Sequence, residues 1–140
     1  MAAIMLKDSG DERVAAQVRE LLKNLQSDPS NGVADILEGD AIKQRGAFPG
    51  AAFLVVMQLG YYVIGDATSA LVGDITGTLG SHGFSPEYPE MRAAFFIAGA
   101  GIARQRDLGI IDMRQIAPTV AQLLKVRLPS APLAPLNVHQ

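Results

Sequence analysis

The sequence contains no cysteine in its 140 residues. This absence excludes disulfide bonds, thiolate nucleophiles and zinc clusters built on cysteine. Any metal site in the chain must therefore be made from histidine, aspartate and glutamate side chains.

An excess of charge of either sign is also lacking, since 12 Lys and Arg residues and 14 Asp and Glu residues leave a net charge of −2. Such a chain has no general positive field to hold a nucleic acid polymer or an anionic membrane surface. Residues 93–103 (AAFFIAGAGIA) are apolar, but this run is well short of the roughly 18 residues that a membrane span needs. The apolar start breaks into charged residues from Lys7 onward, so we expect neither a signal peptide nor a membrane anchor.

The composition does provide the material for a core, because 49% of the residues are hydrophobic and only 19% are charged. A chain of this length fits one domain. We therefore expect a single domain over residues 1–140. The helices and strands described next place it in the α/β class, in which a short mixed sheet is packed by an N-terminal and a C-terminal helix.

Two stretches carry apolar residues at helical spacing. The first covers residues 14–25, with Asp11 and Glu12 at the favourable N-terminal end, and it stops at the turn-rich residues 27–32. The second begins near Ile116. Gln115 is expected at its cap position, with a turn at Asp112 before it, and Pro118 stands where the first helical turn tolerates a missing N–H.

Shorter apolar runs predict strands. Residues 33–37 are expected to form one strand, followed by a short helix or turn over residues 40–45 that Asp40 caps and Gly46 closes. The remaining predictions are a hairpin of two strands at residues 53–57 and 61–64, a strand at residues 92–98 buried on both faces, and a tail at residues 129–135 that runs along the surface.

The long segment over residues 65–89 has no regular pattern and is rich in Gly, Ser, Thr, Asp and Pro, which is typical of functional or irregular loops. It contains His82, which is followed by Gly83 and preceded by Gly80-Ser81. Glycines allow sharp turns and close approach, so this pattern favours an imidazole presented from a loop at a strand end. The other histidine, His139, is one residue from the end of the sequence, where order is rare.

Spacing alone leaves several roles open for His82. It could fill a turn and bond a carbonyl group. It could join Ser81 or Ser85 and an aspartate in a catalytic triad, although no Gly-x-Ser-x-Gly elbow is present. Asp66 and Asp74 could join it as metal ligands, but they lack the spacing that would place them on one face.

A longer sequence pattern favours one of these roles for His82. Residues 80–91 (GSHGFSPEYPEM) are followed by an apolar run and glycine turn at residues 92–103, by residues 111–121 (IDMRQIAPTVA) and by residues 126–129 (VRLP). In order, spacing and residue type these segments resemble the C-terminal part of the type I phosphodiesterase and nucleotide pyrophosphatase family, within the alkaline phosphatase superfamily. The resemblance is close from residue 80 to 129 and looser over residues 11–64.

The resemblance implies that His82 is a ligand of one of two zinc ions in a phosphoric ester hydrolase acting on a small-molecule phosphoester. The family's Thr or Ser nucleophile and its aspartate ligands have no counterpart here. The chain therefore looks like the C-terminal fragment of a longer enzyme, and we expect it to be inactive alone. Two positions depart from the family: Lys125 stands where a helix-ending glycine is usual and Gln105 where a turn glycine is common.

A non-catalytic interaction module is the alternative function. In either case we expect self-association, because a segment taken from a larger sheet keeps strands, such as residues 53–57 and 92–98, whose apolar edges are open. The mean hydropathy of +0.19 agrees with this expectation.

Overall fold

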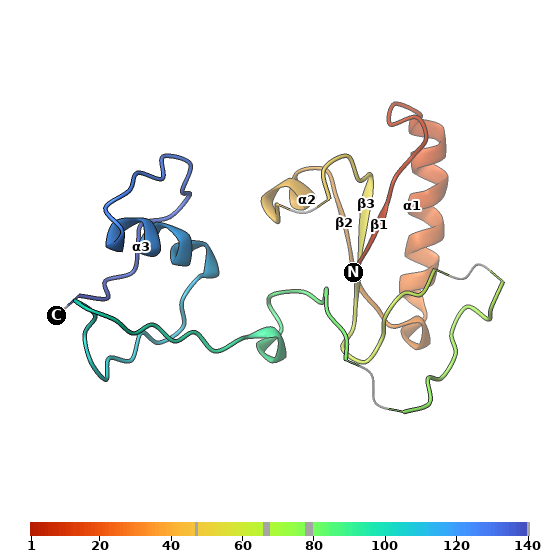
Figure 1. The fold of residues 1–140 in the computed structure, drawn as a ribbon. Helices are drawn as coiled ribbons and strands as arrows, with labels where there is room; N and C mark the ends of the chain where they lie inside the picture. The colour runs from red at the N-terminus through yellow and green to blue at the C-terminus, as the bar shows by residue number, and fades with distance from the viewer. Residues whose placement is uncertain (47, 66–67, 78–79, 140) are drawn as a thin grey trace. The chain divides into compact units, whose positions relative to one another are not determined.

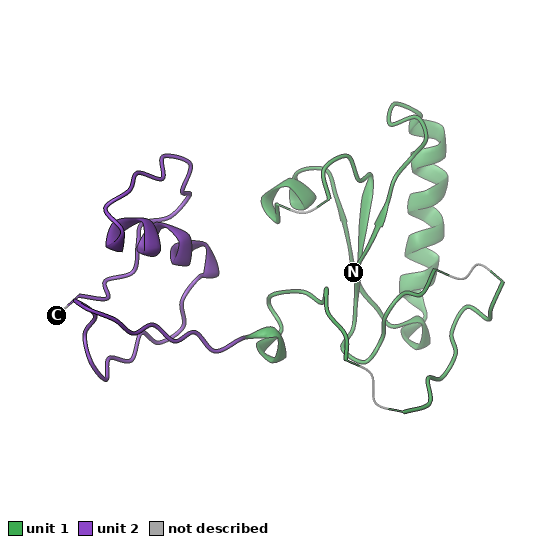
Figure 2. Cartoon of the chain, in the orientation of Figure 1, with its two compact units in different colours: residues 1–92 green, residues 93–140 purple. Residues whose placement is uncertain are grey.

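The structure is a computed structural model that describes residues 1–46, 48–65, 68–77 and 80–139. The chain divides into two units, Met1–Arg92 and Ala93–Gln140 (Figure 2). Each unit has a hydrophobic cluster of its own. The expectation of one domain over residues 1–140 stays a prediction.

The first unit is built on a three-stranded antiparallel sheet (Figure 1). Its strands are β1 (Ala2–Ile4), β2 (Val33–Glu38) and β3 (Phe53–Met57), in the order β1-β3-β2. All five residues of β3 are buried, because this uncharged strand has a neighbour on each edge and is covered on both faces. The α/β class is confirmed, but the sheet is antiparallel throughout rather than mixed.

One helix covers a face of this sheet. Helix α1 (Glu12–Ser27) begins where the Asp11 carboxylate accepts a hydrogen bond from the backbone N–H of Val14 at 2.9 Å. Its buried Leu22 joins alternate side chains of β3 in the core of the unit. The sequence prediction of this amphipathic helix is confirmed.

An ion pair holds α1 to the edge strand β2. The guanidinium of Arg19 donates to both carboxylate oxygens of Glu38, at 2.7 to 2.9 Å, and lies 5.5 Å from the centre of the Phe53 ring. The hydrogen bonds to Glu38 raise the pKa of Arg19. Both side chains are about one-third exposed, so solvent weakens the pair, and its main effect is to fix the helix over the sheet.

The short helix α2 (Asp40–Gln44) follows β2 directly and buries Ile42. Gly39 occupies its N-cap position, so the prediction that Asp40 caps this helix is wrong. Asp40 is instead the first helical residue and pairs with the Lys43 ammonium at 2.8 Å. Gly46 follows the helix with a φ of 63°, which confirms the predicted stop.

The predicted hairpin between residues 53–57 and 61–64 does not form. A turn follows β3 as expected, with the Tyr61 N–H bonded to the Gln58 carbonyl, but residues 61–64 have no strand structure. The physical reason is that β1 and β2 occupy both edges of β3. For the same reason β3 has no open edge, which corrects the expectation that residues 53–57 drive association.

The second unit contains helix α3 (Ile116–Leu123). Gln115 lies at its N-cap position, and a preceding 3-10 turn (Met113–Gln115) begins at Asp112, as predicted. The Asp112 carboxylate accepts hydrogen bonds from the side chain and backbone of Arg114, which lower its pKa to about 2. The Gln115 side-chain oxygen accepts a hydrogen bond from the Asp112 N–H at 3.2 Å, which completes a capping box.

The core of this unit is made largely by its tail. Ile102, Leu136 and Val138 are buried together, and the Ala103 N–H bonds the Val138 carbonyl at 2.8 Å. Residues 92–98, predicted as a strand buried on both faces, form no sheet, and Phe96 is 91% exposed. His139, in a region where order is rare, forms an isolated antiparallel bridge with Ile102.

Helix α3 ends in a left-handed cap formed by a residue other than glycine. The Val126 N–H bonds the Ala121 carbonyl at 2.9 Å and the Lys125 N–H bonds the Gln122 carbonyl at 3.1 Å, which is the Schellman pattern. Lys125 occupies its left-handed position with a φ of 57°, and Gln105 also has a positive φ of 54°. Both are the positions at which the sequence lacks an expected glycine.

A stability prediction follows for Lys125. We expect Lys125→Gly to increase the free energy of unfolding by about 0.5–1 kcal/mol, because glycine adopts the left-handed conformation without the steric cost of a Cβ atom. Lys125→Ala is the matched control, since it removes the same ammonium and keeps the Cβ. Urea denaturation followed by circular dichroism measures both, and an equal gain in the two variants would show that charge, not backbone conformation, is responsible.

No helix in the described ranges is long and apolar enough to cross a membrane.

Candidate functional site

His82 lies in an exposed loop of the first unit. Its ring makes no hydrogen bond or ion pair with any residue that the structure describes. The next residue, Gly83, has a φ of 78°, so the chain turns there in a conformation that glycine adopts freely. The predicted exposed loop is confirmed, although no described strand begins or ends beside the histidine.

The residues after His82 are anchored, which fixes the place from which the imidazole extends. Phe84 packs against the core cluster of the first unit, next to buried side chains of α1 and β3. The Gly83 carbonyl accepts a hydrogen bond from the Met1 nitrogen at 2.6 Å. The Tyr88 hydroxyl donates to the Met57 carbonyl, at the end of β3, at 3.4 Å. The loop is therefore exposed at His82 and tied to the sheet on its C-terminal side.

The strongest of these ties is made by Arg45, at the C-terminal end of α2. Its guanidinium donates to the Ser85 hydroxyl at 3.1 Å and to the Glu87 carboxylate at 2.9 Å. Ser85 is only 4% exposed, and its oxygen also accepts a long bond from the Glu87 N–H at 3.4 Å. A forked, permanently charged donor suits two acceptors on one turn.

This arrangement bears on the triad considered from the sequence. The Ser85 oxygen is buried and accepts from Arg45 and from a backbone N–H, so Ser85 acts as an anchor of the loop. Ser81 is exposed. The structure shows neither serine bonded to His82.

Two acidic residues were considered as metal ligands beside His82. Asp74 is exposed, and Asp66 falls outside the described residues. Within the described ranges, no three His, Asp or Glu side chains form a group that could hold a metal ion. Catalytic zinc normally takes three protein ligands, so the described part of this chain does not complete a zinc site.

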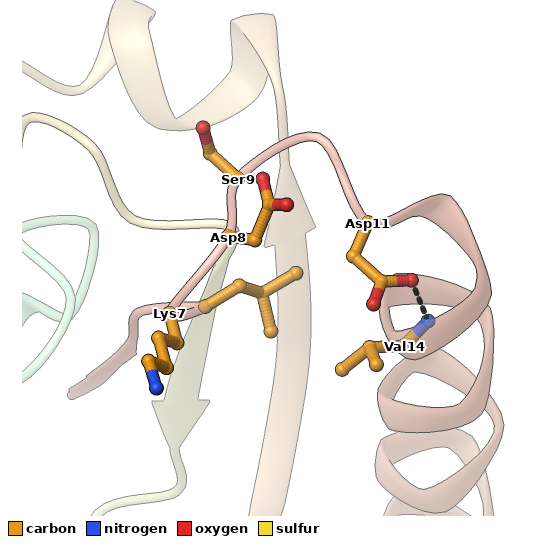
Figure 3. A pocket seen from close by; sticks show the side chains of 6 residues that line it. Lys7, Asp8, Ser9, Asp11 and Val14 are labelled. Atoms are coloured by element: carbon orange, nitrogen blue, oxygen red, sulfur yellow. Dashed lines mark hydrogen bonds between the residues drawn. The ribbon is translucent and has the colours of Figure 1, made fainter.

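A hollow in the first unit lies elsewhere, beside the start of α1 (Figure 3). It has a volume of about 640 Å³ and is open to solvent. Its two carboxylates serve the backbone: Asp11 accepts from the Val14 N–H, as the dashed line in Figure 3 shows, and Asp8 accepts from the Gly10 N–H at 2.9 Å. These residues cap a turn and a helix, which accounts for their positions.

Sequence reasoning did not find Arg45, Phe84 or Tyr88 as supports of the His82 loop. Arg45 and Ser85 are 40 positions apart, so no local spacing connects them. The signal in the sequence was only indirect: no Lys or Arg lies between Arg45 and Arg92, and Glu87 lies in this intervening segment.

No family model, no curated protein and no solved structure was found to match this chain.

Proposed function

We propose that this chain supplies one metal-ligand imidazole, from His82, to a zinc-dependent phosphoric ester hydrolase resembling the type I phosphodiesterases and nucleotide pyrophosphatases. The observation that carries the proposal is the stretch at residues 80–91 (GSHGFSPEYPEM), followed in order by three further segments that resemble the same family. A single Gly-Ser-His-Gly would be weak support, whereas an ordered series over fifty residues is much more specific.

The geometry of the loop supports this role. A metal ligand needs a free nitrogen lone pair and a main chain held firmly enough to aim it. His82 is exposed with no protein partner among the described residues, and the next residues are held by Phe84 in the core and by the Arg45 guanidinium. A histidine that only filled a turn would bond a nearby carbonyl.

Two backbone conformations add support from outside the loop. Gln105 and Lys125 have φ values of 54° and 57°, at the two places where the resemblance expects glycine. Non-glycine residues are uncommon in this region. If the chain were compared with the family one residue out of register, the expected glycines would not fall on these two positive-φ residues.

Zinc bound at such a site would polarise the phosphoryl group and lower the pKa of the attacking hydroxyl. The part played by His82 would be to hold the ion through a neutral ring nitrogen. The nucleophile and the aspartate ligands would come from the part of the family's chain that precedes the matched segments. Because they have no counterpart in these residues, no catalytic step is assigned to this chain alone.

The 140-residue chain is therefore expected to release no product from an aryl phosphodiester in saturating zinc, above the rate in buffer. One imidazole does not replace the three protein ligands of a catalytic zinc ion. The released aryl chromophore measures the rate directly. Product release by this chain would contradict the expectation. If His82→Ala abolished that release, the assignment of the remaining zinc ligands to a preceding part of the chain would also be wrong.

A longer chain tests the proposal itself. The coding frame upstream of Met1 is expected to encode a Thr or Ser nucleophile and acidic ligands, and the protein made from it is expected to hydrolyse the same substrate. In that protein His82→Ala should lower turnover by about 100-fold or more and reduce the bound zinc. His139→Ala is the matched control, because it removes the other imidazole. An upstream frame without those residues, or His82→Ala with full zinc and turnover, would refute the proposal.

A further inference from the structure

The guanidinium of Arg45 joins two side chains of the turn that follows His82. It donates to the buried Ser85 hydroxyl at 3.1 Å and to the Glu87 carboxylate at 2.9 Å. Arg45 is the more enclosed of the two charged groups, with a side chain 24% exposed against 73% for Glu87. Hydrogen bonds from a charged donor are stronger than those between neutral groups. A single side chain therefore fixes two points of this turn.

The helix that carries Arg45 is itself well placed. Arg45 ends α2, where its backbone N–H bonds the carbonyl groups of Ile42 and Lys43. The helix lies against β2, and its Ile42 is buried. The other cation of this helix is used locally, because Lys43 pairs with Asp40 of the same helix at 2.8 Å and its side chain is 78% exposed. Arg45 is thus the cation through which α2 reaches the loop.

His82 is close to this turn along the chain. Only Gly83 and Phe84 separate it from the first side chain that Arg45 holds. Phe84 packs against the core cluster of the first unit, and Gly83 has a φ of 78°. Residues 80–81, on the other side of the histidine, are exposed. Three residues of chain span at most roughly 11 Å, so the place of the imidazole depends directly on how firmly the turn is held.

We propose that Arg45 is a positioning residue for His82: by holding Ser85 and Glu87 it keeps the loop in the conformation that presents the imidazole to a metal ion. The consequence for zinc rests on the proposed function, whereas the effect on loop order does not. A site that is formed for only a fraction of the time binds its ligand more weakly by that fraction. Groups that orient a metal ligand typically contribute about 10- to 100-fold in metal affinity.

The effect on the loop can be measured in the 140-residue chain by NMR relaxation of the backbone amides. Arg45→Met keeps an apolar stem and removes the forked donor. The order parameters of the His82 and Gly83 amides should therefore fall below about 0.6, while those of α1 and β3 stay near about 0.85. Lys43→Met is the matched control and should leave the loop unchanged. A loop that is already mobile in the unaltered chain, or equally ordered in Arg45→Met, would overturn the proposal.

A second variant covers the case in which Arg45→Met does not fold, as circular dichroism would show. Glu87→Gln removes the charge of one acceptor and leaves the buried Ser85 hydroxyl with its donor. It should lower the same two order parameters, by less than Arg45→Met, because a charged acceptor is replaced by a neutral one. If only Glu87→Gln folded and its loop were as ordered as in the unaltered chain, the proposal would be wrong.

The effect on zinc is tested in the longer protein that the upstream frame encodes, with Zn²⁺ alone as the probe and a chromophoric chelator as the competitor. Arg45→Met should weaken zinc binding by about tenfold when His82 is present. In the His82→Ala background it should cause no further loss, because Arg45 acts through that imidazole. Equal losses in the two backgrounds would indicate a general structural effect and would overturn the positioning role.

The positioning role and the proposed function fail in different ways. Zinc binding that His82→Ala weakens and Arg45→Met does not would refute the role of Arg45 and leave the proposed function standing. Full zinc binding in His82→Ala would refute the proposed function and with it the role in metal binding. The relaxation measurements would still decide whether Arg45 orders the loop.

Discussion

Gly32→Ala is expected to destabilise the first unit by at least about 2 kcal/mol, for two reasons that act together. Gly32 has a φ of 64°, where a Cβ atom is strained. A Cβ at this position would also lie 2.1 Å from the first ring carbon of Tyr61, which is too close for any pair of atoms. The first ring carbon of tyrosine moves only if the side chain rotates about χ1 or the backbone moves, so either the Tyr61 ring would have to leave its place against the core cluster or the turn after β3 would have to shift.

The same turn is tied to Gly32 through the main chain. The Gly32 carbonyl accepts a hydrogen bond from the Gln58 N–H at 2.8 Å, directly after β3. A shift of Tyr61 would therefore strain the contact between the two turns that flank β2 and β3. Urea denaturation followed by circular dichroism would measure the loss.

Gly46→Ala separates the two causes. Gly46 has a nearly identical φ of 63°, and a Cβ there would meet nothing within 4 Å. This variant should lose only the backbone contribution of about 1 kcal/mol. In the Gly32→Ala/Tyr61→Ala double variant the steric part should disappear, so the two losses should be less than additive. Equal losses for Gly32→Ala and Gly46→Ala would show that the ring gives way freely.

The elements predicted correctly are those whose cause is local. Helix α1 follows from apolar spacing and from Asp11 at its start, and β3 from five consecutive apolar residues. β1 was not predicted, since Ala2–Ile4 is too short to carry a period and is a strand only because it pairs with β3. Residues 61–64 carry a stronger strand pattern but find both edges of β3 occupied. Pairing therefore depends on which edge is free, and propensity alone does not specify it.

In the candidate site, too, features with a local cause were predictable and features that depend on distant residues were not. The exposed position of His82 and the positive φ of Gly83 follow from glycine chemistry in a short motif. The Arg45 guanidinium that holds the loop comes from 40 positions away and is visible only in the folded chain. In the second unit, residues 92–98 were predicted to form a strand buried on both faces, but they form no sheet and no described strand covers Phe96.

The tail of the second unit ends inside the core of that unit. Residues 129–135 were expected to run along the surface, and the residues that follow them enter the core, where Leu136 and Val138 are buried. Thr119 of α3 holds them there. Its side chain is fully buried, its hydroxyl donates to the Gln115 carbonyl at 2.6 Å, and it accepts the Leu136 N–H at 2.8 Å.

Thr119→Val is expected to reduce the stability of the second unit by about 1–3 kcal/mol, because it keeps the shape of the side chain and leaves the buried Leu136 N–H without an acceptor. Thr119→Ser keeps the hydroxyl and removes one methyl group, at a cost of about 1 kcal/mol. Amide hydrogen exchange distinguishes them: the Leu136 amide should exchange faster in Thr119→Val relative to the α3 amides, whereas Thr119→Ser should leave that ratio unchanged. Unaltered exchange at Leu136 in Thr119→Val would mean that apolar packing of the tail, rather than the threonine hydroxyl, holds it in the core.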